Sequence, residues 1–595
     1  MHRRERHISG QREPACGVFT HGAVTNRRVR CSYCLLARIR EVEPVVSLST
    51  LLQNIADAEP GPETCAVFDF DGTIISGYSA TAFLKDQIAR GEISPADLVQ
   101  LTQAASRFGI GSLGFSALMA VHAQYLAGRS EAHYVANSER LFRRAIAKLI
   151  YPEARQLIEA HRAAGHSIAI ISSATPYQVL PAAKDLGIKH VYATDLEVED
   201  GQFTGGVVQP TCFGIGKVHA AERFTAEQGS NLENCFFYSD STDDIELLET
   251  AGRPVVLNGS RDLKQIAREA GWSMADFSSR GNATSSQVLR SLAATGSLVG
   301  SFMMGLPLYA LSGSRRDSLN FSISLFVETA SALIGLDLDV RGRENLWKQR
   351  PAIFMFNHQS NADMLIMASL IRRDIVGVGK RELKNLPVIG PLMGAAGVVF
   401  IDRSDRQAAI ETMKPLVQAM QEEKKSLVIA PEGTRAPTRK LGAFKKGGFH
   451  VAIQSGVPIV PVVIHNSGDI SPKGDKIFRS GTVHVDVLPA IETTDWSVAN
   501  IDEHVADVRN AFLRTLGQPE LSVEETARAR RDTPDDLKPE VRGRRQKAGL
   551  KNSASDPSEQ DSVPPKRRGK RGIPNEMRSV GSQNGFDPEA PATRH

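Results

Sequence analysis

The sequence predicts two α/β domains joined by a hydrophobic helical segment. The chain of 595 residues is longer than a single hydrophobic core usually supports. Within about 46–280, and again within about 341–515, short apolar runs bounded by Gly, Pro and Asp alternate with helical patterns, which favours parallel sheets. The intervening segment, 281–340, contains long apolar stretches, so we interpret it as a helical linker.

The composition is that of globular domains and excludes a secreted, disulfide-rich protein. Hydrophobic residues make up 41% of the chain and charged residues 23%. A formal net charge of +4 identifies no partner, and six cysteines are too few for a disulfide framework at this length. Cys31 and Cys34, with Cys16 nearby, could bind zinc, but no second pair follows, so we predict no metal there.

Both ends of the chain are predicted to be basic and disordered. Residues 1–45 lack periodicity and are interpreted as a flexible arm, and 516–595 combine dense charge with Pro and Ser. The run KRRGKR at 566–571 is either a solvated tail or a segment that binds an anionic membrane surface. Since no signal-peptide pattern is found in the arm, we expect a cytoplasmic location.

Five apolar runs are the predicted strands of the first domain: CAVFDF (65–70), SIAIIS (167–172), HVYAT (190–194), NCFFYSD (234–240) and PVVLN (254–258). The first run ends in Asp69-Phe70-Asp71-Gly72-Thr73, and ligands of open parallel sheets bind at the carboxyl ends of strands. Because Gly72 lets the chain turn, Asp69 could attack a phosphorus atom while Asp71 donates and recovers a proton. Taken alone, the motif could also be a simple Asp-capped turn.

Three later elements fit the same chemistry. Ser173 follows the second run and supplies a hydroxyl, although the neighbouring Ser172 is an alternative. Lys217 offers a cation for a phosphoryl oxygen. Asp240 and Asp244 follow the fourth run, and carboxylates at such a position suit Mg²⁺.

In this order, the four pieces resemble the haloacid dehalogenase superfamily, specifically its phosphoserine-phosphatase-like branch (subclass IB). The resemblance covers about 65–260 and implies a Rossmann-like parallel sheet with a helical cap over about 78–150. It also implies that Asp69 forms an aspartyl-phosphate and that Asp71 is the acid and base. The remaining implied roles are phosphoryl binding by Ser173 and Lys217, and Mg²⁺ binding by Asp69, Asp71, Asp240 and Asp244.

The linker is predicted to contact a membrane. Residues 291–313 carry no charge and are long enough to cross a bilayer, but Gly, Ser, Thr and Pro307 dilute their hydrophobicity. In 318–336, Glu328 is the only charged residue. We therefore expect a pair of helices over about 291–336 that enters one leaflet, and the alternative is a buried helical pair of a soluble domain.

Six apolar runs are the predicted strands of the second domain: AIFMFN (352–357), DIVGVG (374–379), GVVFID (397–402), SLVIAP (426–431), PIVPVVI (458–464) and VHVDVL (483–488). The first run leads into His358, and Asp363 follows five residues later. We expect His358 at the strand exit and Asp363 in the first turn of the next helix. There the carboxylate would orient an imidazole that deprotonates a hydroxyl. The H-x4-D spacing is a weak signal by itself, because a histidine at a strand end is often structural.

Basic and glycine-containing motifs accompany this pair. Arg403 follows the third run, Pro431-Glu432-Gly433-Thr434-Arg435 follows the fourth, and Phe444-Lys445-Lys446-Gly447 comes next. Arg and Lys beside glycine-loosened backbone favour a phosphate pocket. In this order the motifs resemble the glycerol-phosphate and lysophosphatidate acyltransferase family over about 340–490.

This second resemblance implies a reaction and its site. His358, with Asp363, would be the general base, without a covalent acyl-enzyme. The residues that would bind the acceptor phosphate are Arg403, Glu432, Gly433 and Arg435. Lysophosphatidate (1-acyl-glycerol-3-phosphate) or glycerol phosphate would accept an acyl group from an acyl-coenzyme A or acyl-carrier-protein thioester.

The leading interpretation is a bifunctional enzyme of phospholipid synthesis at the cytoplasmic face of the cell membrane. It would contact membrane lipids, and its phosphatase domain would need Mg²⁺. We expect no nucleic-acid partner, because the basic ends contain no recognised motif. The alternatives are an acyltransferase with a catalytically silent, regulatory phosphatase-like domain, and a phosphatase tethered to a non-catalytic lipid-binding module.

Overall fold

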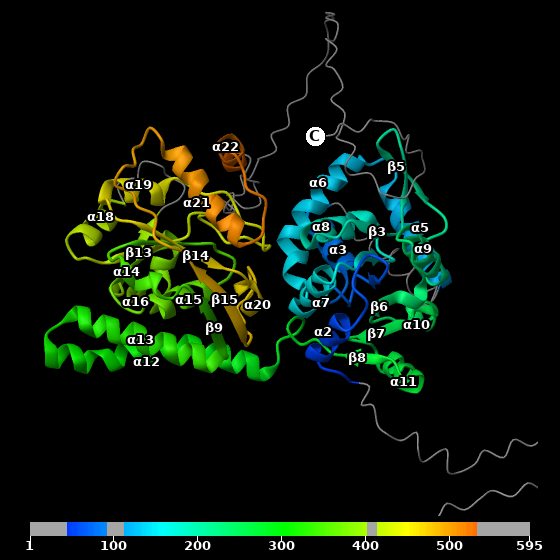
Figure 1. Ribbon diagram of the computed structural model, residues 1–595, viewed down its shortest axis with the longest axis horizontal. Helices are drawn as coiled ribbons and strands as arrows, with labels where there is room; N and C mark the ends of the chain where they lie inside the picture. The colour runs from blue at the N-terminus through cyan, green and yellow to red at the C-terminus, as the bar shows by residue number, and fades with distance from the viewer. Residues whose placement is uncertain (1–44, 92–111, 402–412, 532–595) are drawn as a thin grey trace, which may run out of the picture. The chain divides into compact units, whose positions relative to one another are not determined.

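The computed structural model describes residues 45–91, 112–401 and 413–531, whose elements are labelled in Figure 1. Several predictions lie outside these residues. They concern the N-terminal arm with Cys16, Cys31 and Cys34, part of the cap, Arg403, and the C-terminal run KRRGKR.

The first domain is built on a six-stranded parallel sheet in the order β3–β2–β1–β6–β7–β8. Its strands are β1 (Cys65–Phe68), β2 (Ser167–Ile171), β3 (His190–Tyr192), β6 (Cys235–Ser239), β7 (Arg253–Leu257) and β8 (Ser273–Ala275). The five predicted strands are confirmed. The sixth, β8, was not predicted, because three residues are too short for a periodic signal.

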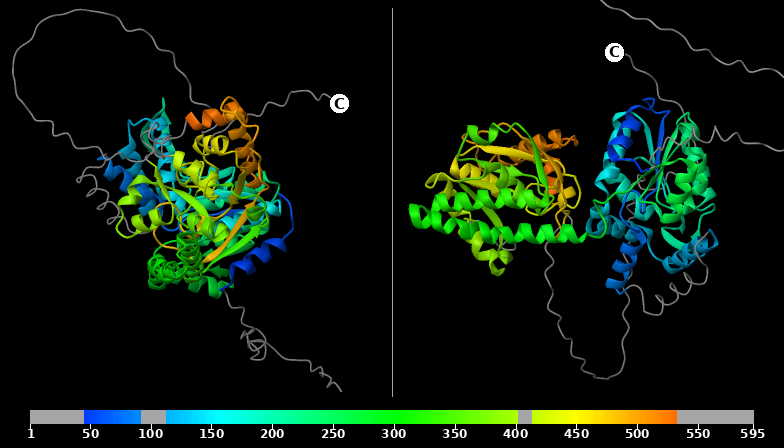
Figure 2. Two further views of the ribbon diagram at one scale, coloured as in Figure 1. Left: turned by 90° about the vertical axis from the view of Figure 1, so that its left-hand side faces the viewer. Right: turned by 90° about the horizontal axis from the view of Figure 1, so that it is seen from below.

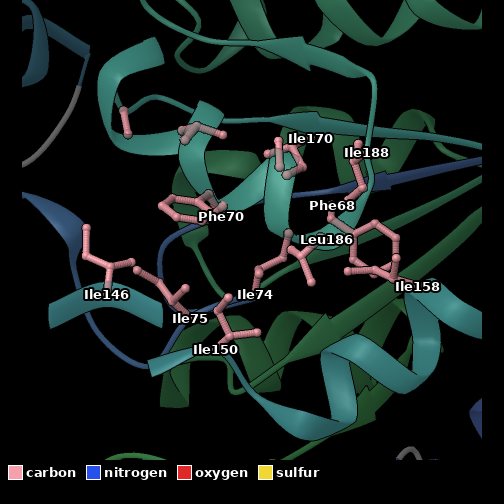
Figure 3. Packing of buried hydrophobic residues seen from close by; sticks show 14 of the residues in the cluster. Phe68, Phe70, Ile74, Ile75, Ile146, Ile150, Ile158, Ile170, Leu186 and Ile188 are labelled. Carbon is pink, nitrogen blue, oxygen red and sulfur yellow. The ribbon is translucent and has the colours of Figure 1, made fainter. Parts of the chain in front are cut away.

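Helices cover this sheet: α2 (Leu48–Ala56), α7 (Pro152–Ala163), α8 (Pro176–Leu186), α9 (Ile215–Glu227), α10 (Ile245–Thr250) and α11 (Arg261–Ala270). Figure 3 shows Phe70 on the side of Ile74 and Ile75, and Phe68 beside Leu186 and Ile158, within one hydrophobic cluster. Phe70 lies between the two aspartates of the first motif and is fully buried. The hydrophobic core therefore anchors the loop that carries Asp69 and Asp71.

The region predicted as a cap is helical in its described parts: α3 (Ser79–Ala89), α5 (Ser112–Leu126) and α6 (Glu131–Leu141). A hairpin of β4 (Leu196–Glu199) and β5 (Gln202–Val207) contacts α5 and was not predicted. Its turn is Asp200-Gly201, with φ of 49° and 74°. An Asp-Gly pair between alternating residues is a hairpin signal that the sequence does contain.

The predicted helical pair is confirmed as α12 (Ser285–Ser312) and α13 (Arg315–Ile334). The two helices run side by side as an antiparallel hairpin in Figures 1 and 2. Gly305 allows close contact, because a Cβ there would lie 2.1 Å from Ser322 Oγ. Among the described residues, α12 is the one helix that is long and apolar enough to cross a membrane.

The second domain has a seven-stranded sheet in the order β12–β11–β13–β10–β14–β15–β9, in which only the β14–β15 pairing is antiparallel. Its strands are β9 (Leu336–Arg341), β10 (Ile353–Phe356), β11 (Ile375–Lys380), β12 (Val399–Ile401), β13 (Ser426–Ile429), β14 (Ile459–Ile464) and β15 (Gly481–Val487). The six predicted strands are confirmed. The linker prediction of 281–340 was wrong at its end, because alternating Leu, Val and charged residues make β9 a half-buried strand.

The helices of this domain are α14 (Asn345–Lys348), α15 (Ala362–Ile371), α16 (Ile389–Ala395), α18 (Lys414–Gln421), α19 (Gly447–Ser455), α20 (Ser467–Ile470), α21 (Ile501–Thr515) and α22 (Val523–Arg531). The prediction of disorder from residue 516 was wrong for α22. Arg530 Nη2 donates to Asp502 Oδ1 at 2.8 Å, and Leu521 N donates to Asn510 Oδ1 at 3.0 Å. These contacts fasten the segment to α21.

Candidate active sites

Lys217 connects two carboxylates at the carboxyl edge of the first sheet. Its Nζ lies 2.9 Å from Asp69 Oδ1, directly after β1, and 2.8 Å from Asp244 Oδ1, after β6. Ser239 Oγ donates to Asp244 Oδ2 at 2.6 Å. Burial lowers the pKa of Lys217, but the two carboxylates outweigh that effect, so its pKa is raised and the ammonium form is favoured. The fold thus brings three of the predicted residues together.

Asp71 is held by the start of α3. Ser79 N donates to its Oδ1 at 2.8 Å, and Ser79 Oγ donates to its Oδ2 at 3.0 Å. Gln178 Nε2 in turn donates to Ser79 Oγ at 3.1 Å. Burial raises the pKa of Asp71 to about 6, although the Ser79 hydrogen bonds oppose the shift. Such a carboxyl can exchange a proton near neutral pH. Sequence reasoning missed both Ser79 and Gln178.

Asp240 lies against the turn of the first motif. Gly72 has φ of +77°, and a Cβ there would lie 1.9 Å from Asp240 Oδ2, so only glycine allows this approach. Thr73 Oγ1 donates to Asp240 Oδ1 at 3.4 Å, and Asn258 Nδ2 donates to the Gly72 carbonyl at 2.9 Å. Burial, followed by repulsion from Asp69 and Asp244, raises the pKa of Asp240 to about 8.

The donor chemistry here fits a hard divalent cation. The charges of Asp69 and Asp244 raise the pKa of Asp240, the charge of Asp244 raises the pKa of Asp69, and Lys217 opposes both effects. Burial also raises the pKa of Asp69 to about 7. When all three carboxylates are ionised, two negative charges are left beside the Lys217 ammonium (three less one), which a divalent cation with oxygen ligands would balance.

The predicted ligand set fits only in part. Among the described residues, no three His, Cys, Asp or Glu side chains form a ready-made metal cluster. Both oxygens of the Asp71 carboxylate accept hydrogen bonds from Ser79. The Asp244 carboxylate pairs with Lys217 and accepts a hydrogen bond from Ser239. Asp69 also contacts Lys217, but through Oδ1. Asp240 and the second carboxylate oxygen of Asp69 are therefore the donors that best fit a metal.

The two candidate serines after β2 differ in exposure. Ser172 is buried, and its Oγ accepts from Ala174 N at 3.2 Å. Ser173 is only half-buried. Its hydroxyl is therefore the more accessible of the two at this strand end.

In the second domain, His358 and Asp363 form a close pair. His358 Nδ1 lies 2.7 Å from Asp363 Oδ2. That oxygen also accepts from Gln359 N at 2.7 Å and Ser360 N at 2.8 Å, and Asp363 is fully buried. Because a carboxylate only accepts, Nδ1 carries the proton, and Nε2 is left as the basic nitrogen. As predicted, His358 follows the end of β10, and Asp363 is in the first turn of α15.

Glu432 supports the main chain of His358. Its Oε1 accepts from His358 N at 2.7 Å, and its Oε2 accepts from Gly442 N at 2.8 Å. The His358 carbonyl accepts from Ala436 N at 2.7 Å. Glu432 is 5% exposed, and burial raises its pKa to about 7. Glu432, which was predicted to bind the acceptor phosphate, thus uses both oxygens as acceptors for main-chain N–H groups.

Two cationic side chains, Arg435 and Lys445, belong to or contact the Glu432–Arg435 segment. Arg435 Nη1 donates to Asn361 Oδ1, between His358 and Asp363 in the chain. Burial lowers the pKa of Arg435, while Asp363 opposes the shift. Gly433 has φ of +71°, and a Cβ there would lie 3.0 Å from the end of the Lys445 side chain. The absence of a side chain at Gly433 therefore leaves room for the end of the Lys445 side chain.

An apolar pocket that the sequence did not predict is lined in part by Met364, the residue after Asp363 in the chain. It has a volume of about 150 Å³. Its lining includes side chains from the helical pair, α15, α16 and the sheet: Phe302, Phe326, Met364, Met367, Leu392 and Val428.

Comparison with known proteins agrees with this division. A family profile described as haloacid dehalogenase-like hydrolase matches residues 66–249, and one described as Acyltransferase matches 337–465. The chain is 37% identical to 1-acyl-sn-glycerol-3-phosphate acyltransferase of Saccharomyces cerevisiae, over 32% of this chain and 63% of that protein. Identity to the enzyme of the same name from Limnanthes alba is 35%, over 33% of this chain and 70% of that one.

The first domain has relatives of a different kind. Identity to phosphoserine phosphatase SerB1 of Mycobacterium tuberculosis is 35%, over 36% of this chain and 70% of that protein. The two kinds of relative correspond to the two sheets.

Proposed function

Because the chain belongs to the haloacid dehalogenase-like hydrolases through its first domain and to the acyltransferases through its second, we propose that it is a bifunctional enzyme of phospholipid synthesis. The second domain would acylate the sn-2 hydroxyl of 1-acyl-glycerol-3-phosphate to form phosphatidate. The first would hydrolyse a phosphate monoester. The observation that carries the acyltransferase proposal is the 2.7 Å contact between His358 Nδ1 and Asp363 Oδ2.

The proposed acyl transfer uses the basic Nε2 of His358, which is free of a proton because Nδ1 donates to Asp363. His358 Nε2 takes the proton of the acceptor hydroxyl, whose oxygen attacks the thioester carbonyl. The C–S bond breaks, the ester forms, and the proton passes from the imidazolium to the departing thiolate. Asp363 stabilises the imidazolium in between. Arg435, Lys445 and Arg403 would bind the acceptor phosphate, and Gly433 would let the backbone approach it.

The apolar elements suit a lipid substrate. The pocket lined by Met364 and Phe302 would hold part of an acyl chain. Exposed apolar side chains on α12 would place the domain at a membrane surface: Leu289, Leu292, Met303, Met304 and Leu311.

The first test uses the purified protein in detergent. Acyl-coenzyme A and 1-acyl-glycerol-3-phosphate are supplied, and free thiol and phosphatidate are measured for wild type and His358→Ala. We expect the variant to lose activity by about 10²- to 10⁴-fold. Equal rates in the two proteins would mean that His358 is not the base.

Phosphatase activity is proposed as a second function, because Lys217 lies between Asp69 and Asp244. Asp69 attacks the phosphorus atom, and the P–O bond to the alcohol breaks as Asp71 donates its proton. Asp71 then takes a proton from water, which hydrolyses the aspartyl-phosphate. Lys217, with Ser173, would balance phosphoryl charge. Mg²⁺ held by Asp69 and Asp240 would supply further charge neutralisation.

The phosphatase test measures inorganic phosphate released from phosphoserine, glycerol phosphate, lysophosphatidate and phosphatidate. Asp69→Asn should lower release by more than about 10³-fold, because it removes the nucleophile. Since both domains would handle phosphate monoesters, we expect release from one of the lipid intermediates. Release from phosphoserine alone would contradict that expectation.

A further inference from the structure

We propose that Arg509 on α21 is a positioning residue for His358, which it reaches through the Leu441–Gly442 peptide and Glu432. The inference rests on the proposed acyl transfer. Arg509 lies 44 residues beyond the end of the matched acyltransferase region at residue 465 (509 less 465). No motif in the sequence indicated it.

A continuous chain of hydrogen bonds links the two residues. Arg509 Nη2 donates to the Leu441 carbonyl at 3.2 Å. The N–H of the same peptide, that of Gly442, donates to Glu432 Oε2 at 2.8 Å. Glu432 Oε1 accepts from His358 N at 2.7 Å. Hydrogen bonds in such a chain polarise one another, so the guanidinium charge strengthens the contacts further along it.

The local packing is built around this chain. A Cβ at Gly442 would lie 2.5 Å from Glu432 Oε2, so the carboxylate can approach only a glycine. Arg509 Nε also donates to the Gly442 carbonyl at 3.1 Å. Arg509 is 5% exposed, and a buried guanidinium is costly unless opposite charge opposes it. Glu432 supplies that charge, because it opposes the lowering of the Arg509 pKa by burial.

The ionisation of Glu432 decides how well His358 is held. When Glu432 is ionised, each of its two oxygens can accept one backbone N–H, from His358 and from Gly442. Protonation places a hydrogen on one oxygen and weakens it as an acceptor. Burial raises the pKa of Glu432 to about 7, against the hydrogen bonds from His358 and Gly442; of the nearby charges, Asp363 raises this pKa and Arg509 lowers it. His358 and Gly442 face it as backbone donors. Removing the Arg509 charge would therefore raise the Glu432 pKa and leave more of it protonated at neutral pH.

Kinetics of four variants test this role. Arg509→Met removes the charge and the donors, Arg509→Gln keeps a donor without charge, and Arg509→Lys keeps the charge. Arg514→Met on the same helix is the control, because Arg514 is exposed and pairs with Glu520. The full-length protein is assayed for kcat and for the acceptor KM over a range of pH.

We expect Arg509→Met to lower kcat by about 10- to 100-fold with little change in KM, because the base is misplaced while the acceptor is still bound. The acidic limb of the kcat profile should move to higher pH in the Met and Gln variants, because the Glu432 pKa rises when the Arg509 charge is lost. Arg509→Lys should restore much of the activity. Arg514→Met should behave as wild type.

Two outcomes would overturn the inference. One is an unchanged kcat and pH profile in a folded Arg509→Gln protein. The other is read without enzymatic activity, from the infrared band of the protonated Glu432 carboxyl, assigned with Glu432→Gln. Its titration midpoint must be higher in Arg509→Gln than in wild type, and an equal midpoint contradicts the proposal. An inactive wild type would refute the acyltransferase function and leave this second measurement decisive.

Discussion

The carboxylates of the two candidate sites are held by different sets of donors. Asp71 is held by two donors from Ser79 alone, and burial raises its pKa to about 6, so it can hold and release a proton. Asp363 accepts from the His358 ring and from two backbone N–H groups, which directs its charge to the imidazole. These donors fit the proposed roles of Asp71 as proton carrier and Asp363 as orienting group.

Replacing Ser79 with Ala should shift the pH dependence of phosphate release. The Ser79 hydrogen bonds favour ionised Asp71, so losing the hydroxyl raises the Asp71 pKa. Asp71 must be protonated to act as an acid, so the alkaline limb of kcat/KM should move to higher pH by up to about one unit. Thr81→Ala, at an exposed position on α3, is the control. An unchanged limb in Ser79→Ala would show that Asp71 is not the acid.

At the level of elements, the α12–α13 hairpin combines a packed face with an exposed apolar face. Gly305 packs against Ser318 and Ser322, and Ser318 Oγ donates to the Gly305 carbonyl at 2.7 Å. Met303 and Met304 are 61% and 60% exposed in the same helix. Large exposed apolar side chains of this kind are typical of a surface that contacts a partner or a membrane.

A double variant, Met303→Lys/Met304→Lys, tests this surface. It should lower binding to phospholipid vesicles by at least about tenfold, because it removes apolar area from the membrane contact. Ser285→Lys/Ser286→Lys adds the same charge at exposed polar positions of α12 and is the control. The measurement is co-sedimentation with vesicles. Equal loss in both variants would mean that charge, rather than the apolar face, controls binding.

At the level of the whole molecule, each proposed reaction has a sheet of its own. Asp69 and Asp244, the two partners of Lys217, follow strands of the six-stranded sheet. His358 follows a strand of the seven-stranded sheet. Separate hydrophobic clusters support the two sheets. The sites therefore need no shared residue for chemistry.

Independent inactivation of the two reactions is the expected consequence. Asp69→Asn should abolish phosphate release and leave acyl transfer within about twofold of wild type, since sites that share no residues usually act additively. His358→Ala should do the reverse. Both assays are run on each full-length variant. Loss of acyl transfer in Asp69→Asn would instead favour a regulatory role for the first domain.

Most strands and the local parts of both sites could be predicted, because their signals are contained in short windows. Apolar runs marked the strands, and the five-residue spacing of His358 and Asp363 is close enough for the chain itself to bring them together. Elements of few residues or mixed polarity escaped: β8 is too short, and β9 alternates apolar with charged residues beside an apolar helix. The start of α22 was masked by dense charge.

By itself, the sequence determined two α/β domains, the carboxylates at the first sheet's edge and the His–Asp pair of the second. Only the tertiary structure decided how the remaining side chains are used. In the fold, Glu432 accepts from the His358 main-chain N–H, and Asp244 pairs with Lys217. Arg509 donates to the Gly442 carbonyl. These contacts join segments far apart in the chain, and they depend on strand order and helix packing. No local pattern of residues records that order, so spacing alone could not predict them.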